Sequence, residues 1–404
     1  MHVSQRSAVP AFEVMRILDR IAELRGQGRD VVSLCAGEPS GGAPAAVHAR
    51  AQQIHADRAD LGYTPALGVH PLREAIAGHY RRWYDLEVDP GQVAITTGSS
   101  GAFLLSFLAA FDVGDRVALA RPGYPAYRNI LGALGCEVVE IDCGPAERFQ
   151  PTPAALDAVQ ADGPLAGLVI ASPANPTGTM VSRSELTALS DWCRTHGVRL
   201  VSDEIYHGIT YPDDPSVPDA RGVCAWQAEA DGGDAEPSAV VVSSFSKYWG
   251  MTGWRLGWAL VPGDLRGAVD ALAGNVALCP PAPAQAASVA AFSEESYAEA
   301  DARVAEFAAT RALLLDQLDR LGWGTVAPAD GAFYLYADLA DKLGDYPDAA
   351  AWAAALLEGE GVALVPGIDF DGAHGGTYVR LSLAAGRDAV AEAIERIVRF
   401  QTRQ

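Results

Sequence analysis

The chain has 404 residues, which is too long for one typical domain, so two domains are expected. Its hydrophobic share of 49% is ordinary for a globular protein, and its sequence contains neither a periodic repeat nor an apolar stretch of membrane-spanning length. The net charge of −21 argues against a nucleic-acid partner, because so acidic a chain repels phosphate backbones.

The six cysteines form no C-x-x-C pair and show no metal-ligand spacing, which favours free thiols in a reducing cytosol. The first residues lack the apolar segment typical of a signal peptide. We therefore expect a cytoplasmic protein with no metal site and no membrane span.

The first predicted element is an amphipathic helix that ends at Gly26 and Gly28. Its apolar residues recur at helical spacing: Val14, Ile17, Leu18, Ile21 and Leu24. A short strand at 30–34 follows and leads into a turn at 36–42.

Between about residues 90 and 265, apolar strands alternate with helices. Strands are predicted at 93–97, 116–120, 136–141, 167–172, 198–204 and 239–245, and helices at 102–111 and about 127–134. A further helix begins with the capping box Ser182-x-x-Glu185 and ends at Gly197. Continuous apolar strands flanked by helices predict a mostly parallel sheet covered by helices on both faces, an α/β fold.

Residues 212–237 are rich in Asp, Pro and Gly, which indicates a surface excursion without a catalytic role. An Ala-rich helical stretch is predicted over 285–321, followed by short strands within 331–339, 362–367 and 377–384. We expect three parts: an N-terminal segment (1–45) that packs with the small domain, a large domain (46–284) and a small C-terminal α/β domain (285–404).

Polar and Gly-rich residues follow the predicted strands repeatedly, at the sheet edge where ligands bind in such folds. These segments are Gly98-Ser99-Ser100, Gly123-Tyr124, Asn175-Pro176, Asp203 to Tyr206, and Ser244 to Lys247. Their convergence indicates one site.

Lys247 directly follows a buried strand, where partial desolvation lowers the pKa of an amine and makes it a nucleophile toward an aldehyde. A single lysine at such a position more often extends to the surface. The neighbouring Ser244, Ser246 and Arg255 favour the Schiff-base interpretation, since hydroxyls and a guanidinium suit a phosphate dianion.

Three segments have a structural and a functional interpretation side by side. Gly98-Ser99-Ser100 either caps a helix or exposes amides to an anion. Asp203 either makes a surface contact or keeps a pyridine nitrogen protonated, and Tyr206 either packs or donates to a ring oxygen.

The remaining candidates carry the same ambiguity. Asn175-Pro176-Thr177-Gly178 is a tight turn by composition. Either a cis proline there points the Asn175 amide at a cofactor, or the segment is plain turn chemistry. Tyr124 either stacks on a flat ring or packs in the core. Arg380 either points outward from its strand or, if buried, binds a substrate carboxylate.

Taken together, these residues resemble the class I/II aminotransferases, which are fold type I enzymes dependent on pyridoxal 5′-phosphate. The resemblance runs from the turn at Gly37, through Tyr63 and Leu72-Arg73, to Val379-Arg380. Its most specific part is an ordered set of motifs: Asn175-Pro-Thr-Gly, Asp203-Glu-Ile-Tyr206, Ser244-Phe-Ser246-Lys247 and Gly253-Trp-Arg255-Leu-Gly.

The resemblance implies a role for each matching residue. Lys247 forms the Schiff base with pyridoxal phosphate and shuttles the proton, Asp203 pairs with the ring nitrogen, and Tyr124 stacks on the ring. Asn175 and Tyr206 contact its phenolic oxygen, while Arg380 binds the substrate α-carboxylate with Gly37 close by. The implied phosphate ligands are Gly98, Ser99, Ser100, Ser244, Ser246 and Arg255, with Tyr63 reaching the partner subunit of a homodimer.

The implied reaction moves an amino group from an L-amino acid to a 2-oxo acid. Ser100 stands where some dicarboxylate-specific relatives have a lysine, and residues 267–301 contain no arginine, so a strong aspartate preference is not expected. A C–S β-lyase reaction on the same site is the main alternative. A non-catalytic effector-sensing module is disfavoured by the charge of −21, and a structural protein would not need Lys247, Asp203 and Asn175 together.

Overall fold

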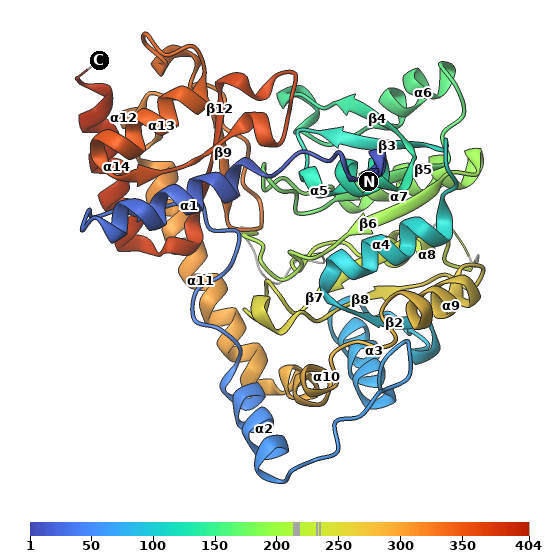
Figure 1. Ribbon diagram of the computed structural model, residues 1–404. Coiled ribbons are helices and arrows are strands. Elements are labelled where there is room, and N and C mark those ends of the chain that lie inside the picture. Colours follow the sequence, from blue (N-terminus) through green and yellow to red (C-terminus); the bar gives the residue numbers. More distant parts are fainter. Residues whose placement is uncertain (213–218, 232, 234–235, 404) are drawn as a thin grey trace.

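The computed structural model describes residues 1–212, 219–231, 233 and 236–403, and its centre is a seven-stranded sheet (Figure 1). In spatial order the strands are β2 (Val93–Thr96), β8 (Gly257–Leu260), β7 (Val240–Ser244), β6 (Arg199–Asp203), β5 (Gly167–Ala171), β3 (Arg116–Arg121) and β4 (Glu137–Asp142).

All strands of this sheet except β8 run in the same direction, which confirms the mostly parallel sheet. Strand β8 is antiparallel to both of its neighbours and was not among the predicted strands. It is only four residues long and contains a glycine and a tryptophan, so it lacks the continuous aliphatic pattern of the other strands.

Side chains that alternate along each strand build two cores, one on each face of the sheet. Val169 and Val201 pack on one face with α4 (Gly98–Ala110), α5 (Pro125–Leu134) and α9 (Arg266–Val276). Leu168 and Leu200 belong to the core of the other face. That face is covered by α3 (His70–Tyr84), α6 (Pro153–Ala161), α7 (Arg183–His196) and α8 (Ala225–Asp231).

Helix α7 shows how local sequence sets an element. The Ser182 hydroxyl accepts from the Glu185 amide and the Glu185 carboxylate accepts from the Ser182 amide, which confirms the predicted capping box. Leu186, Leu189 and Cys193 are buried, and Gly197 ends the helix with a positive φ.

A second, smaller body contains the three-stranded sheet β11 (Val365–Pro366), β12 (Tyr378–Ser382) and β9 (Tyr334–Asp338). The N-terminal segment joins this body through β1 (Val32–Ser33), which pairs with β10 (Val362–Ala363), and through α1 (Glu13–Gly26). Its other helices are α11 (Glu294–Asp316), α12 (Leu318–Leu321), α13 (Ala349–Glu360) and α14 (Arg387–Gln401). Helix α2 (Ala45–Ala56) packs on α10 (Ala282–Ser288).

Three sequence expectations were wrong in part. The 212–237 segment is not all surface, because α8 buries Trp226 and Glu229; residues 213–218, 232 and 234–235 lie outside the described part. The 285–321 stretch is not one helix but α10, a 3₁₀ turn (Val289–Phe292), α11 and α12. Residues 362–367 form two strands in different sheets.

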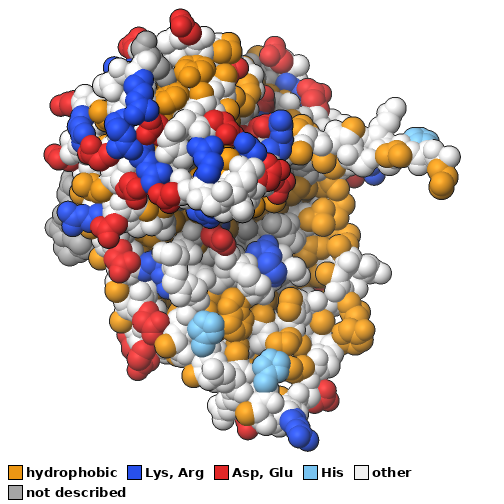
Figure 2. All heavy atoms as spheres, turned by 60° about the vertical axis from the view of Figure 1, so that its left-hand side comes forward, with side chains coloured by type: hydrophobic (Ala, Val, Ile, Leu, Met, Phe, Trp, Pro, Cys, Tyr) orange, Lys and Arg blue, Asp and Glu red, His pale blue; other side chains and the backbone are white. Residues whose placement is uncertain are grey.

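Acidic and basic side chains are interspersed on the face shown in Figure 2, where neither sign gathers into one patch. Many are paired at the surface, as in Arg20–Glu358 at 2.7 Å and Arg320–Glu395 at 2.5 Å. Among the described residues, no helix combines the length and the apolar character that crossing a bilayer requires.

Candidate functional site

A cavity of about 590 Å³ lies where the carboxyl ends of β5 and β6 face the smaller body. Three parts of the chain line it together: the strand-to-helix turns of the large sheet, the N-terminal segment, and the smaller body with β9, β12 and residues 369–370. The predicted site residues on its wall are Gly37, Ser99, Ser100, Tyr124, Asn175, Asp203, Tyr206, Ser246, Lys247, Arg255 and Arg380.

Lys247 is three residues beyond β7, and its Nζ donates to the carbonyl of Gly37 at 2.6 Å. Burial, reinforced by the Arg380 guanidinium, lowers the pKa of this amine to about 8. A substantial fraction of the amine is therefore neutral near pH 7–8 and able to act as a nucleophile.

Asp203 ends β6 and is almost fully buried. Burial raises the pKa of its carboxyl to about 6, while hydrogen bonds from the Tyr127 hydroxyl and the Ile205 amide (3.0 Å), together with the Lys247 cation, oppose the shift. The carboxylate thus presents a negative charge to the cavity with each oxygen held by one protein donor.

The first turn of α4 lies at one end of the cavity and combines free amides with a cation. Ser99, Ser100, Ser246 and Arg255 all reach this wall. A Cβ at Gly98 would lie 2.5 Å from Arg255 Nη2, so only glycine lets the guanidinium approach the helix start this closely. The arrangement suits an anion with several oxygens.

Arg380 in β12 is buried, and Nη1 donates to Asn175 Oδ1 at 2.9 Å while Nη2 donates to the Cys35 carbonyl at 3.1 Å. Its Nε is buried without a hydrogen-bond partner among the described residues. A buried donor without a partner costs free energy, so this guanidinium is set up for a further acceptor such as a carboxylate.

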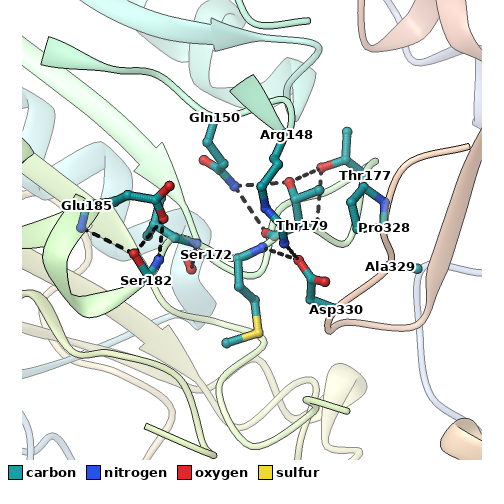
Figure 3. Close-up of polar contacts among 12 residues, drawn as sticks. Arg148, Gln150, Ser172, Thr177, Thr179, Ser182, Glu185, Pro328, Ala329 and Asp330 are labelled. Atoms are coloured by element: carbon teal, nitrogen blue, oxygen red, sulfur yellow. Dashed lines mark hydrogen bonds and ion pairs between the residues drawn. The ribbon is translucent and has the colours of Figure 1, made fainter. Parts of the chain in front are cut away.

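The turn that carries Asn175 has no regular secondary structure. It is closed by a backbone bond from the Ala174 amide to the Thr179 carbonyl at 3.0 Å, and side chains add to it (Figure 3). The Gln150 amide donates to the carbonyl of Ala171 at 3.2 Å and to the carbonyl and hydroxyl of Thr179 at 3.1 and 3.2 Å. Asp330 accepts from the Met180 amide at 3.1 Å and from Arg148. The Asn175–Pro176 peptide bond is cis.

Aromatic side chains form the remaining walls. The hydroxyls of Tyr206 and Tyr334 are 2.9 Å apart, and the Arg380 guanidinium lies 4.4 Å from the ring centre of Tyr334. Tyr124 stacks on Phe12 of the N-terminal segment, with ring centres 6.2 Å apart.

Three predicted residues do not line the cavity. Gly98 lies behind Arg255. Ser244 is buried and accepts from the Ser246 amide at 3.1 Å, so it supports the neighbouring loop. Tyr63 is 86% exposed and turned away from this chain's own cavity.

Several wall residues were not among the predicted site residues: Phe12, Met15, Leu18, Tyr127, Ile130, Tyr334 and Phe370. An apolar residue carries the same helical or strand periodicity whether it faces a core or a cavity, so only Tyr127 and Tyr334 gave a signal. Their hydroxyls, within apolar patterns, required a buried partner.

Comparisons with known proteins agree over almost the whole chain. Residues 29–397 match the family described as aminotransferase class I and II. The valine–pyruvate aminotransferase of Mycobacterium tuberculosis is 52% identical over 98% of this chain and 97% of its own length. The aspartate/prephenate aminotransferase of Thermus thermophilus is 34% identical over 93% of this chain and 92% of its own.

Solved structures give the same result. A crystal structure of an aminotransferase from Mycobacterium tuberculosis has a TM-score of 0.93 and 51% identity, covering 100% of both chains. A putative aminotransferase from Silicibacter pomeroyi has a TM-score of 0.88 and 39% identity over 100% of both chains. The expected fold type I architecture is confirmed, and this chain belongs to the class I and II aminotransferases, enzymes that transfer an amino group to a 2-oxo acid.

Proposed function

We propose that this cavity binds pyridoxal 5′-phosphate through Lys247 and uses it to move the amino group of an apolar L-amino acid to a small 2-oxo acid. The observation that carries the proposal is the joint burial of an amine of lowered pKa, a carboxylate and an arginine with an unpartnered Nε in one cavity. Such a set of perturbed groups in a cleft is typical of a catalytic centre.

The donor set fits this cofactor from end to end. The α4 N-terminus, Ser246 and Arg255 suit its phosphate, and the Asp203 carboxylate suits a protonated ring nitrogen. A Cβ at Gly257 would lie 2.7 Å from the Ser99 amide nitrogen, so β8 and the α4 start pack too closely for a side chain there. This close packing holds the proposed phosphate cradle rigid.

Pyridoxal phosphate, when bound, supplies an aldehyde that condenses with amines and a ring that withdraws electrons. The chain's own residues do the rest. With that group bound, Lys247 would hold its aldehyde and, as a free amine, would accept the α-proton of the substrate at Nζ. Asp203 would supply a negative charge to the ring nitrogen, and Asn175 and Tyr206 would hold the ring's oxygen substituent.

Arg380 binds the substrate's α-carboxylate in this proposal. Its two Nη atoms are already fixed by Asn175 and Cys35, so the guanidinium plane is held before substrate arrives. Little side-chain entropy remains to be lost on binding, and the α-hydrogen is brought toward Lys247 in a defined orientation.

The cavity wall supports an apolar donor. Phe12, Met15, Leu18, Ile130 and Phe370 contribute carbon surface to the wall. Among the described residues that line the cavity, the cations are Lys247, Arg255 and Arg380, and each already has a proposed role. A side-chain carboxylate would find Glu38 and Asp369 rather than a cation. The name of the Mycobacterium tuberculosis relative, which includes valine and pyruvate, supports the same substrate class.

The test is an amino-donor panel on purified enzyme, with valine, leucine and aspartate as donors and pyruvate as acceptor. We expect kcat/KM for valine to exceed that for aspartate by at least about tenfold. The side-chain carboxylate of aspartate would be buried without a cation, which costs binding free energy, whereas the side chain of valine contacts apolar wall residues. Lys247→Ala should abolish both turnover and the covalent cofactor link. Turnover by this variant at the native rate, or release of pyruvate and ammonia from cysteine conjugates as the main reaction, contradicts the proposal.

We also propose that the chain divides into an N-terminal segment (1–45), a large domain (46–284) and a small domain (285–404).

We further propose a homodimer with shared sites. Exposed Tyr63 lies near a stretch that exposes Val276, Leu278 and Val289, since the neighbouring Thr64 accepts from Gln285 at 3.0 Å. Mixing Tyr63→Ala and Lys247→Ala chains tests the dimer. If sites are shared, each hybrid dimer contains one site with both native Lys247 and native Tyr63. Activity should then rise above that of either variant alone.

A further inference from the structure

Tyr127 connects the start of α5 to the carboxylate at the end of β6. It lies in the first turn of α5, and its hydroxyl donates to Asp203 Oδ2. The ring packs edge-on against Phe103 of α4, with centres 5.0 Å apart, and against Tyr124 at 5.4 Å. This packing holds the ring on two sides while its hydroxyl reaches Asp203.

The Tyr127 hydroxyl keeps its proton under all ordinary conditions. Burial, together with the neighbouring Asp203 charge, raises the pKa of the phenol well above its usual value of about 10. A protonated phenol beside a carboxylate is a donor, and the bond is charge-assisted.

The carboxylate depends on that bond because its surroundings oppose its charge. Burial raises the pKa of Asp203, and the Tyr127 hydrogen bond is the largest effect in the opposite direction, ahead of the Ile205 amide and the Lys247 cation. The next residue, Glu204, is also buried, and burial raises its pKa to about 8. Glu204 is therefore largely protonated at neutral pH and does not stabilise the Asp203 charge.

We propose that Tyr127 is a positioning residue for the transamination reaction: its hydroxyl keeps Asp203 ionised and, with the Ile205 amide on the other oxygen, fixes the plane of the carboxylate. The inference rests on the proposed function, in which Asp203 faces the cofactor's ring nitrogen. If the phenol is lost, the proton shared between Asp203 and that nitrogen moves toward the carboxylate. The ring then withdraws electrons less strongly.

A purely structural role for Tyr127 makes a different prediction. Tyr127→Phe preserves the ring and its contacts with Phe103 and Tyr124, so packing alone would leave the cofactor's electronic state unchanged. A role through the hydroxyl requires that state to change while the fold is retained.

The experiment measures the ¹⁵N chemical shift of the ring nitrogen in holoenzyme reconstituted with ¹⁵N-labelled pyridoxal phosphate, between pH 6 and 9. In Tyr127→Phe we expect the nitrogen to move toward the neutral-pyridine shift, with its apparent pKa lowered by about one unit, a tenfold change in proton affinity. The kcat should fall about tenfold, with a smaller change in KM for the amino acid.

Tyr80→Phe is the matched control. Tyr80 is also buried, and its hydroxyl accepts from Trp258 at 3.0 Å, so this variant also loses a buried phenol hydrogen bond. It should leave the ¹⁵N shift unchanged. A 3-fluorotyrosine placed at position 127 retains the shape and donates more strongly, so it should move the nitrogen in the cationic direction; this variant decides the question if Tyr127→Phe does not fold.

An unchanged ¹⁵N shift in Tyr127→Phe, or a shift in the same direction with 3-fluorotyrosine, overturns the inference about Tyr127. Failure of the unsubstituted protein to bind the labelled cofactor overturns the proposed function instead. The two failures are therefore distinguishable.

Discussion

The two sides of the cavity are built differently. On the large-sheet side, Asp203 is placed by the backbone pairing of β5, β6 and β7, and Lys247 follows β7. On the facing side, Arg380 comes from β12 of another sheet and donates one hydrogen bond across the cavity to Asn175, which lies in the irregular turn after β5. Strand pairing fixes the backbone on both sides, since β12 itself pairs with β9 and β11. The Arg380 guanidinium, however, is oriented by a few polar groups from other segments.

This contrast suggests a division of labour. The sheet side holds the groups proposed to transfer protons and stabilise charge, so its substitutions should act mainly on kcat. The facing side holds the arginine proposed to bind the substrate carboxylate, so its substitutions should act mainly on KM.

The largest effect is expected at the sheet side, from Asp203→Asn. The amide keeps the shape but loses the charge opposite the ring nitrogen, and kcat should fall by about 10³, the scale seen when a preorganised electrostatic partner is removed. Single-turnover kinetics with valine would measure it. If Asp203→Asn instead raised KM and left kcat nearly unchanged, the proposed contrast would be wrong.

Arg380→Lys should have the next largest effect. Lysine keeps the positive charge but loses the planar donor pair, and with it the bonds to Asn175 and Cys35. We expect KM for the amino donor to rise about 10²-fold, with a smaller loss of kcat. Steady-state kinetics across donor concentrations separate the two constants, and an unchanged KM would show that the carboxylate binds elsewhere.

The sheet side also predicts a pH dependence. The pKa of Lys247 is lowered to about 8 by burial and by Arg380, and only the neutral amine attacks an aldehyde. Covalent attachment of pyridoxal phosphate to the apoenzyme should therefore slow about tenfold for each pH unit below 8 and level off above it. Stopped-flow absorbance measures this rate. A profile that keeps rising to pH 10 would place the amine in a water-exposed setting.

Gln150→Leu should have the smallest effect, and it sharpens the comparison on the facing side. The buried Gln150 amide satisfies acceptors on both sides of the Asn175 turn, so its loss leaves them unpaired at a cost of about 1–3 kcal/mol in unfolding free energy. We expect KM to rise several-fold because the turn no longer holds Asn175 against Arg380, with little change in kcat.

Gln160→Leu provides a control for that variant. Gln160 accepts from the Leu165 amide at 2.8 Å, and among the described residues it makes no hydrogen bond to the Asn175 turn. It should alter stability alone. Equal KM changes in the two glutamine variants would show that general destabilisation, and not the turn, is responsible.

The order of motifs along the chain was enough to predict the parallel sheet, the capped helix α7 and the position of Lys247 and Asp203 at strand ends. These features follow from local periodicity and from the rule that ligands bind at the carboxyl edge of such sheets. Strand β8 and helix α8 were missed because each is short and its burial depends on neighbours distant in sequence.

The amino-acid sequence by itself determined the fold class, the family resemblance and the set of candidate groups, because strand and helix periods and turn residues are local properties. Only the tertiary structure decided that Arg380 is buried and meets Asn175, that Tyr127 donates to Asp203, and that the N-terminal segment closes the apolar wall. Each of these is a contact between side chains far apart in the chain, whose direction is set by packing and not by any local pattern.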